Sequence, residues 1–272
     1  MKTILVVNGE NYWKDIMPDF NVVQKLIQHT SWILKEGKLF VVDAEGVVEP
    51  DAILWRVGAI KPTEIQTTAL NLIELSGIPC VNSPETLKIG FDRLSMLATI
   101  KNLDLPVIDF NVVTKSTHLK NIKTDFPFVV KVGNYHGGYG KVLVEDEKKW
   151  QDIKDLLFVT EHYITIEPFI DYVRDIRYIA IDEKVWAMSR RGKYWKANVE
   201  TTDYEEFEPE VALVNDLKRL QNAIGADIIA VDILEEENGK IHIVEYNDIP
   251  GLSGFSDELK YELASVISKT IS

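Results

Sequence analysis

The chain has 272 residues, of which 46% are hydrophobic and 27% charged, which is enough apolar material for one multi-lobed unit or two small domains. The net charge of −13 disfavours nucleic acid and anionic membranes as partners, and no apolar run approaches the ~20 residues that span a bilayer. The single cysteine, Cys80, cannot form an internal disulfide and is expected to be a buried thiol. These features favour a cytoplasmic protein.

Strands and helices alternate along the chain, which predicts an α/β architecture. Gly77 is expected to end a helix, and Ser83 is expected to begin the next one. We expect an N-terminal α/β lobe over residues 1–84, with strands at 4–7, 38–42, 52–57 and 78–82 and helices at 21–34 and 63–76.

A central lobe is predicted over residues 85–165 and a C-terminal lobe over residues 166–272. Asp182 and Glu183 separate two apolar runs, and this two-residue connection predicts a hairpin. The predicted helices are 92–101, 147–157, 210–224 and 256–269, and the predicted strands are 107–114, 128–133, 141–145, 163–169, 177–182, 184–190, 228–234 and 240–247.

A glycine-rich loop lies between the two predicted strands that carry Lys131 and Lys141. Gly137, Gly138 and Gly140 allow a positive φ and can present backbone N–H groups to anionic oxygens, and the lysines add positive charge for phosphates. The loop lacks the Gly-Lys-Ser/Thr of a Walker A motif. It therefore indicates a phosphate site of another kind, with an ordinary flexible hairpin as the alternative.

Polar side chains interrupt the last two apolar strands at Asp232, Glu245 and Asn247. Burying carboxylates among Val and Ile is costly unless they are paired or bind a cation. Glu245 and Asn247 are two residues apart and share one face of a strand, and a neighbouring strand can bring Asp232 beside them. Such oxygen ligands suit Mg²⁺, with Mn²⁺ as a substitute. A solvent-facing polar stripe is the alternative.

Arg177 begins one strand of the predicted hairpin, and Arg190 ends its partner. The two guanidinium groups can therefore point into one cleft and bind a carboxylate or an acyl phosphate. Considered singly, each arginine is as well explained by a surface salt bridge.

The order of these motifs resembles the ATP-grasp superfamily. The chain is similar to RimK-type α-L-glutamate ligases and lysine-biosynthesis ligases at residues 55–59, 92–94, 128–131, 167–170, 175–177, 230–232 and 245–251. The glycine-rich loop, with residues 167–171, resembles the synapsin ATP-binding domain. The resemblance implies an ATP-grasp fold preceded by an N-terminal α/β lobe, and an ATP- and Mg²⁺-dependent ligase that joins a carboxylate to an amine through an acyl phosphate.

The resemblance also implies roles for particular residues. The implied nucleotide-binding residues are Arg93, Lys131, His136, Gly137, Gly138, Gly140, Lys141, Glu167, Phe169, Ile170 and Asp175. Asp232, Glu245 and Asn247 would hold the metal, and Arg177, Arg190 and Asn198 would lie at the acyl phosphate. The substrates would be a peptide or small-molecule carboxylate and an amine, and a homo-oligomer is an open alternative. A synapsin-like regulatory module that binds ATP without ligase activity is the alternative function.

Two features depart from the family pattern. Arg93 stands where these families usually have a lysine. After Asn198 the ligases continue into a segment rich in Arg and Gly, whereas here residues 201–210 contain five carboxylates and no lysine or arginine. We expect a solvated loop there, and the alternative hypothesis is an acidic lid that attracts a cationic amine or basic peptide.

Overall fold

The protein was analysed as a computed structural model, which describes residues 1–58, 60–192, 195 and 201–271. Its N-terminal part holds a parallel sheet in the order β2-β1-β6-β7 and a small antiparallel sheet in the order β3-β4-β5. The strands are β1 (Thr3–Val7), β2 (Asn21–Lys25), β3 (Ser31–Lys35), β4 (Lys38–Asp43), β5 (Gly46–Val48), β6 (Ala52–Trp55) and β7 (Cys80–Val81). The helices are α1 (Trp13–Ile16), η1 (Ile27–His29), α2 (Glu64–Ser76) and α3 (Pro84–Gly90).

The helix predicted over residues 21–34 is wrong. The segment forms β2, the short helix η1 and β3, and β2 pairs in parallel with β1 from Asn21 opposite Thr3. Val22 and Val23 are β-branched and favour a strand, and Trp32 and Leu34 alternate with exposed neighbours. The spacing of the apolar residues fits both the 3.6-residue repeat of a helix and the two-residue repeat of a strand. Pairing with neighbouring strands decides in favour of the strand.

The predicted helix boundaries at Gly77 and Ser83 are confirmed. Thr63 and Gln66 form a reciprocal capping box at the start of α2, and Gly77 ends that helix with a left-handed φ of 70°. The hydroxyl oxygen of Ser83 accepts a hydrogen bond from the backbone N–H of Thr86 at 3.2 Å and caps α3.

The central part is an antiparallel sheet in the order β10-β9-β11-β8, with its own apolar core. In that core Phe128 packs edge-on against Trp150 of α5, with ring centroids 5.2 Å apart. The expected strand at 107–114 is reduced to β8, and Val107 makes an isolated bridge to Ile243. The elements are α4 (Arg93–Asn102), β8 (Asn111–Val113), η2 (Ser116–Asn121), β9 (Phe128–Val132), β10 (Lys141–Val144), α5 (Glu147–Leu157) and β11 (Ile164–Pro168).

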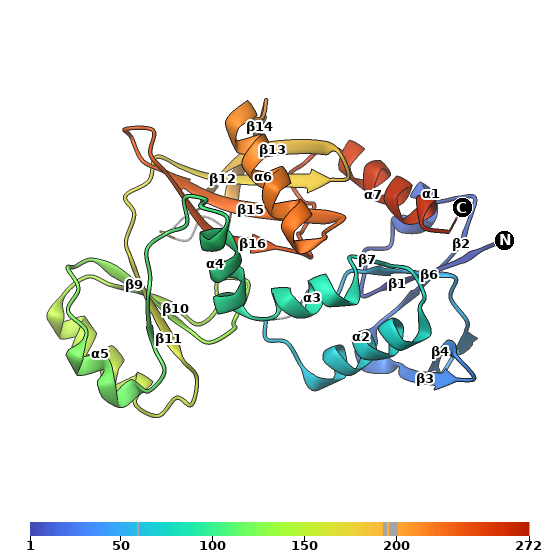
Figure 1. Cartoon of the computed structure of the whole chain (residues 1–272), viewed down its shortest axis with the longest axis horizontal. Coiled ribbons are helices and arrows are strands. Elements are labelled where there is room, and N and C mark those ends of the chain that lie inside the picture. Colours follow the sequence, from blue (N-terminus) through green and yellow to red (C-terminus); the bar gives the residue numbers. More distant parts are fainter. Residues whose placement is uncertain (59, 193–194, 196–200, 272) are drawn as a thin grey trace.

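The C-terminal part is a five-stranded antiparallel sheet in the order β14-β13-β12-β15-β16. The predicted hairpin is confirmed, since Ile181 lies opposite Lys184. The elements are β12 (Arg174–Ile181), β13 (Lys184–Gly192), β14 (Thr201–Phe207), α6 (Val211–Ile224), β15 (Ile228–Glu235), β16 (Ile241–Asn247) and α7 (Glu258–Lys269). In Figure 1 this sheet lies above the N-terminal sheets, and the central sheet with α5 projects to one side.

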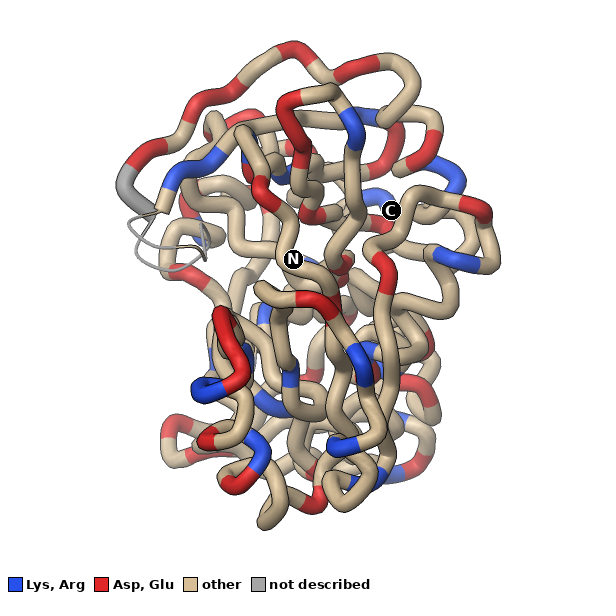
Figure 2. The backbone as a smooth tube through the Cα atoms, turned by 90° about the vertical axis from the view of Figure 1, so that its left-hand side faces the viewer, with Lys and Arg blue, Asp and Glu red and all other residues tan. Residues whose placement is uncertain are grey.

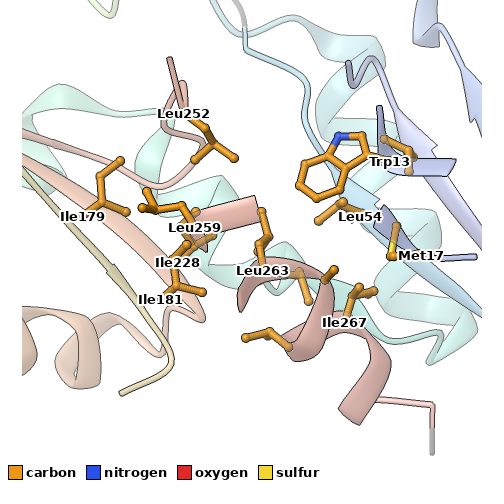
Figure 3. Packing of buried hydrophobic residues seen from close by; sticks show 14 of the residues in the cluster. Trp13, Met17, Leu54, Ile179, Ile181, Ile228, Leu252, Leu259, Leu263 and Ile267 are labelled. Atoms are coloured by element: carbon orange, nitrogen blue, oxygen red, sulfur yellow. The ribbon is translucent and has the colours of Figure 1, made fainter. Parts of the chain in front are cut away.

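Helix α7 joins the first and last sheets through one shared core. Leu259, Leu263 and Ile267 on this helix lie between Leu54 of β6 and Ile181 of β12 (Figure 3). The central sheet does not contribute to that cluster. The N-terminal and C-terminal parts therefore form a common base, against which the central part packs through separate contacts.

The side chain of Asn82 holds this base together through four hydrogen bonds, of which those to Ile228 are buried. Its Nδ2 donates to the carbonyl oxygens of Ile228 and Asp248, both at 2.7 Å. Its Oδ1 accepts from the backbone N–H groups of Asp227 at 2.7 Å and Ile228 at 2.9 Å. Asn82 thus fixes where the strands β15 and β16 begin and end relative to β7.

Acidic positions are distributed along the whole backbone rather than gathered in one part (Figure 2). Within the described residues, no helix combines the length and apolar character needed to cross a membrane. The division of the chain at residues 84 and 165 stays a prediction.

Candidate functional site

The main cleft lies between the central and C-terminal sheets and encloses about 660 Å³ of empty space, including solvent at its mouth. Its walls carry nine of the side chains that the sequence singled out, namely Lys131, Lys141, Glu167, Phe169, Ile170, Asp175, Arg190, Asp232 and Glu245. It also has an apolar lining that the sequence analysis missed, formed by Ile108, Val129, Leu234 and Val244. An apolar slot that ends in charged groups suits an aromatic base joined to phosphates.

At the charged end, Lys131 of β9 lies opposite Lys141 of β10. Thr165 is the partner of Lys131 on β11, and Glu167 is two residues further along on the same face. Lys131 and Glu167 form an ion pair, and their side chains are 5% and 1% exposed. Burial lowers the pKa of Lys131 to about 8, although the charge of Glu167 acts in the opposite direction.

The glycine-rich loop has the backbone conformation that its sequence predicts. Gly137, Gly138 and Gly140 have φ values of 65°, 82° and 64°, in the left-handed region that glycine tolerates best. The N–H of His136 donates to the carbonyl oxygen of Ile60 at 2.8 Å, so the loop is docked on the N-terminal part. Burial lowers the pKa of His136.

Asp232 and Glu245 lie directly opposite each other on β15 and β16. Arg177 binds Asp232 through two hydrogen bonds, from Nε to Oδ1 at 2.7 Å and from Nη2 to Oδ2 at 2.8 Å. Arg190 Nη2 lies 3.3 Å from the same Oδ1. Burial alone would raise the pKa of Asp232, but Arg177 and Arg190 hold it below its usual value.

One carboxylate oxygen of Glu245 contacts two positively charged side chains. Arg93 Nη2 lies 2.8 Å from its Oε2, and Lys141 Nζ lies 3.3 Å from the same atom. Against the effect of burial, Lys141, Arg93 and Lys131 hold the pKa of Glu245 well below its usual value. Arg93, itself 1% exposed, thus connects the start of α4 to the C-terminal sheet.

Arg190 and Asp175 form a second buried pair on the same face of the sheet. Arg190 Nε donates to Asp175 Oδ1 at 2.7 Å, and its Nη2 contacts the same oxygen. Burial raises the pKa of Asp175 to about 6, while Arg190 and Arg177 oppose that rise. The alternative that Arg177 and Arg190 are isolated surface salt-bridge partners is therefore wrong, because both belong to one network around Asp232.

The predicted metal ligands form a set that fits Mg²⁺. Asp232 and Glu245 supply hard carboxylate oxygens, and Asn247 adds an amide oxygen from the same strand face as Glu245. The amide Nδ2 of Asn247 is buried and has no hydrogen-bond partner within the described residues. In that part of the chain no group of three or more His, Cys, Asp or Glu is arranged to hold a metal. A Mg²⁺ site here would therefore need the amide oxygen of Asn247 and oxygens of a bound phosphate, and the metal assignment stays a prediction.

Two further clefts continue from the main one. The second cleft, of about 630 Å³, shares Arg190 and Glu245 with the main cleft and adds Arg177, Asn247 and Gly137. The third cleft, of about 820 Å³, shares Gly137 and Asn247 with the second. The predicted metal ligands and arginines thus lie at the junction between an apolar slot and two more open clefts.

Aromatic residues that the sequence did not assign also line these clefts. Tyr172 and Trp195 border the main cleft, where the Tyr172 hydroxyl donates to the Trp195 carbonyl oxygen at 3.2 Å. Tyr204 borders the second cleft. For Trp195 the available signal in the sequence was its position shortly after Arg190 and Arg191.

The loop expected over residues 201–210 is wrong for most of its length. Residues 201–207 form β14, which pairs with β13, so that Asp203 lies opposite Arg191 and Glu205 opposite Ser189. Strand β14 is an edge of the sheet, where exposed charges are common. Asn198 lies outside the described residues.

Several solved structures share this architecture over nearly the whole chain. A RiPP-associated ATP-grasp ligase of Chryseobacterium gregarium, in complex with ADP and a leader and core peptide, is 13% identical, with a TM-score of 0.73 over 99% of this chain and 97% of that one. The ATP-grasp ligase PsnB, complexed with a phosphomimetic variant of a minimal precursor, Mg and ADP, is 16% identical, with a TM-score of 0.75 over 99% and 98%. The fold is therefore ATP-grasp, as predicted.

The family model for the synapsin ATP-binding domain matches residues 91–270, well over half of the sequence. The chain therefore belongs to that family. A probable α-L-glutamate ligase of Coxiella burnetii is 27% identical over 232 residues, covering 81% of this chain and 76% of the relative. The predicted resemblance to the synapsin ATP-binding domain and to the α-L-glutamate ligases is confirmed.

Proposed function

We propose that the protein joins a carboxylate to an amine through an acyl phosphate, with ATP bound in the main cleft. The observation that supports this proposal is the junction of the three clefts. There Lys141, Arg177 and Arg190 converge on the carboxylates of Asp232 and Glu245, next to the apolar slot. Positive groups held in place by buried carboxylates suit a transferring phosphoryl group.

Each part of the main cleft has a proposed task. The backbone of Glu167, Phe169 and Ile170 would bind the adenine in the apolar slot, and Lys131 would bind the phosphates. The glycine-rich loop, whose Gly137 borders the second and third clefts rather than the main one, would bind the phosphates from that side. Arg93 would act through Glu245, by holding its carboxylate in place, rather than by touching the nucleotide. Asp175 would likewise act indirectly, because its carboxylate accepts a hydrogen bond from Arg190 and holds that guanidinium in place.

Asp232, Glu245 and Asn247 would hold Mg²⁺, which when bound offsets the charge that spreads over the phosphoryl group during transfer. Arg177 and Arg190 would bind the substrate carboxylate and then stabilise its acyl phosphate. Closure of the central sheet over the common base would exclude water from this intermediate. The separate core of the central sheet supports such a motion.

The substrates are proposed to be an amino acid and a peptide or small-molecule carboxylate. The names of the relatives support this class, because they are probable α-L-glutamate ligases and peptide-bound ATP-grasp ligases. The second cleft, bordered by Tyr204 at the edge strand β14, provides an open approach for such a chain.

The test is to trap the acyl phosphate with hydroxylamine. Incubation with ATP, Mg²⁺, hydroxylamine and a panel of carboxylates, including L-glutamate and synthetic peptides with free C-termini, is expected to yield hydroxamate and ADP in equal amounts. Colorimetry and mass spectrometry measure the two products. If no carboxylate gives hydroxamate or stimulates ADP release while ATP still binds, the protein is a regulatory ATP-binding module of the synapsin kind and the proposal fails.

A further inference from the structure

The third cleft differs in charge from the other two. It lies between Gly58, Ile60 and Pro62 of the N-terminal part, the glycine-rich loop at His136 and Gly137, and the segment 247–249 at the end of β16. The second cleft contains Arg177 and Arg190, whereas no lysine or arginine is among the described residues that line the third. Its ionisable lining groups are Asp248 and His136. Because burial lowers the pKa of His136, this imidazole is predominantly neutral at pH 7.

The Asp248 side chain lines this cleft, and no ion pair to it occurs within the described residues. Its Oδ2 is buried and has no hydrogen-bond partner there, while the backbone N–H groups of Asp248 and Ile249 favour the charged form of the carboxyl group. Helix α3 leaves room for the carboxylate at its last residue, Gly90, because a Cβ placed there would lie 2.2 Å from Oδ2. An ionised carboxylate in such a position costs stability unless a cation binds it.

The position of Asp248 relates it to the reaction centre. Asp248 directly follows Asn247, which borders both the second and the third cleft. Gly137 of the glycine-rich loop also borders both clefts. A group bound at Asp248 would therefore lie in the cleft that adjoins the one lined by Arg177 and Arg190. The amine substrate, which is a cation in solution, has the complementary charge for this side of the junction.

We propose that Asp248 binds the ammonium group of the amine substrate and that the third cleft is the amine subsite. This inference rests on the proposed ligase function and assigns the acceptor to one side of the junction. The carboxylate substrate, held by Arg177 and Arg190, then approaches from the second cleft, and the amine approaches from the third. Asp248 acts as a specificity-determining residue that selects cationic amines over neutral molecules of the same shape.

The first test measures ammonium binding directly. Thermal melts of the Mg·ADP-bound protein with methylammonium, L-alaninamide or L-lysinamide are expected to show saturable stabilisation, and N-acetyl-alaninamide is expected to give none. Asp248→Asn is expected to abolish the stabilisation. The matched control is Asp227→Asn, which changes another carboxylate that lines a different cavity. If none of the three cations stabilises the wild type, or if Asp248→Asn responds as the wild type does, the proposal is wrong.

The second test separates this inference from the ligase function. With a carboxylate substrate identified by the hydroxylamine trap, Asp248→Asn is expected to raise the KM for the amine roughly 10- to 100-fold, the loss typical of a hydrogen bond to a charged group. Hydroxamate formation in the same variant reports on the first half-reaction, because hydroxylamine is largely uncharged at neutral pH and needs no carboxylate to bind it. An unchanged KM for the amine would refute the proposal that the third cleft binds the amine, but it would leave the proposed ligase function intact. A loss of hydroxamate formation would instead assign Asp248 to the first half-reaction.

Discussion

Replacing Asn247 by Ala is expected to reduce turnover about 10²- to 10³-fold, on the scale of removing one group that stabilises the transition state. The proposed Mg²⁺ site has two carboxylates, and each is already paired with arginine or lysine. The amide of Asn247 has no such partner through Nδ2, so its loss removes a ligand without releasing a buried charge. Initial rates over a series of Mg²⁺ concentrations, with thermal melts, measure both effects.

The exposed Asn215 on α6 provides a matched control, because Asn215→Ala removes the same amide far from the cleft. Its turnover and melting temperature should stay close to those of the wild type. Wild-type turnover in Asn247→Ala at low Mg²⁺ would contradict the metal assignment.

Glu245 needs a different substitution. Removing its carboxylate leaves Arg93 and Lys141 near each other in a buried site, and breaking a buried ion pair typically costs about 3–5 kcal/mol of unfolding free energy. Glu245→Ala would therefore lower stability as well as turnover. This outcome differs from the simple metal-ligand view, in which the fold is unaffected, and it makes Asn247→Ala the cleaner test.

The KM for ATP is expected to rise as the pH increases above about 8. Burial lowers the pKa of Lys131 from 10.5 to about 8, so its ammonium loses the proton in that range and no longer attracts phosphate. The free energy of unfolding is expected to change in the opposite direction: it rises with pH, whereas ATP affinity falls. The unfolded lysine keeps its proton up to about pH 10.5, so between pH 8 and 10.5 the unfolded state binds more protons and this group stabilises the fold as the pH rises.

Lys131→Arg provides the control, because a guanidinium remains charged over the whole range. Its KM for ATP should not show the step near pH 8, even if the larger side chain changes the absolute value. Lys131→Met should raise the KM at every pH and remove the step. A flat wild-type profile from pH 6.5 to 9.5 would contradict a phosphate-binding role for the Lys131 ammonium.

Local signals predicted the elements that bear the site. A buried strand that ends in Lys131, glycines that allow positive φ, and carboxylates inside Val- and Ile-rich strands are features of residue type and spacing. For each of these features, the neighbouring residues in the sequence are enough to suggest the role that is proposed for it. The same holds for the helix ends at Gly77 and Ser83, which depend on one residue each.

The features that the sequence could not predict depend on contacts between distant segments. Residues 21–34 form strands because β1 is available as a partner, and residues 201–207 form β14 because β13 has a free edge. The salt bridge between Arg93 and Glu245 joins residues 152 positions apart. The sequence showed that Arg93 replaces the lysine usual in these families. It did not show that Arg93 forms a salt bridge with Glu245, a proposed metal ligand.

Isothermal calorimetry with Mg·ATP measures directly whether the main cleft binds the nucleotide. We expect one ATP per chain, a weaker affinity in Lys131→Met, and a matching rise in melting temperature. At a free ATP concentration 100 times the dissociation constant, the stabilisation would be about 2.7 kcal/mol, or roughly 5–10 °C for a chain of this size. The absence of any binding of ATP or ADP at millimolar concentrations, by a protein that melts cooperatively, would contradict the account.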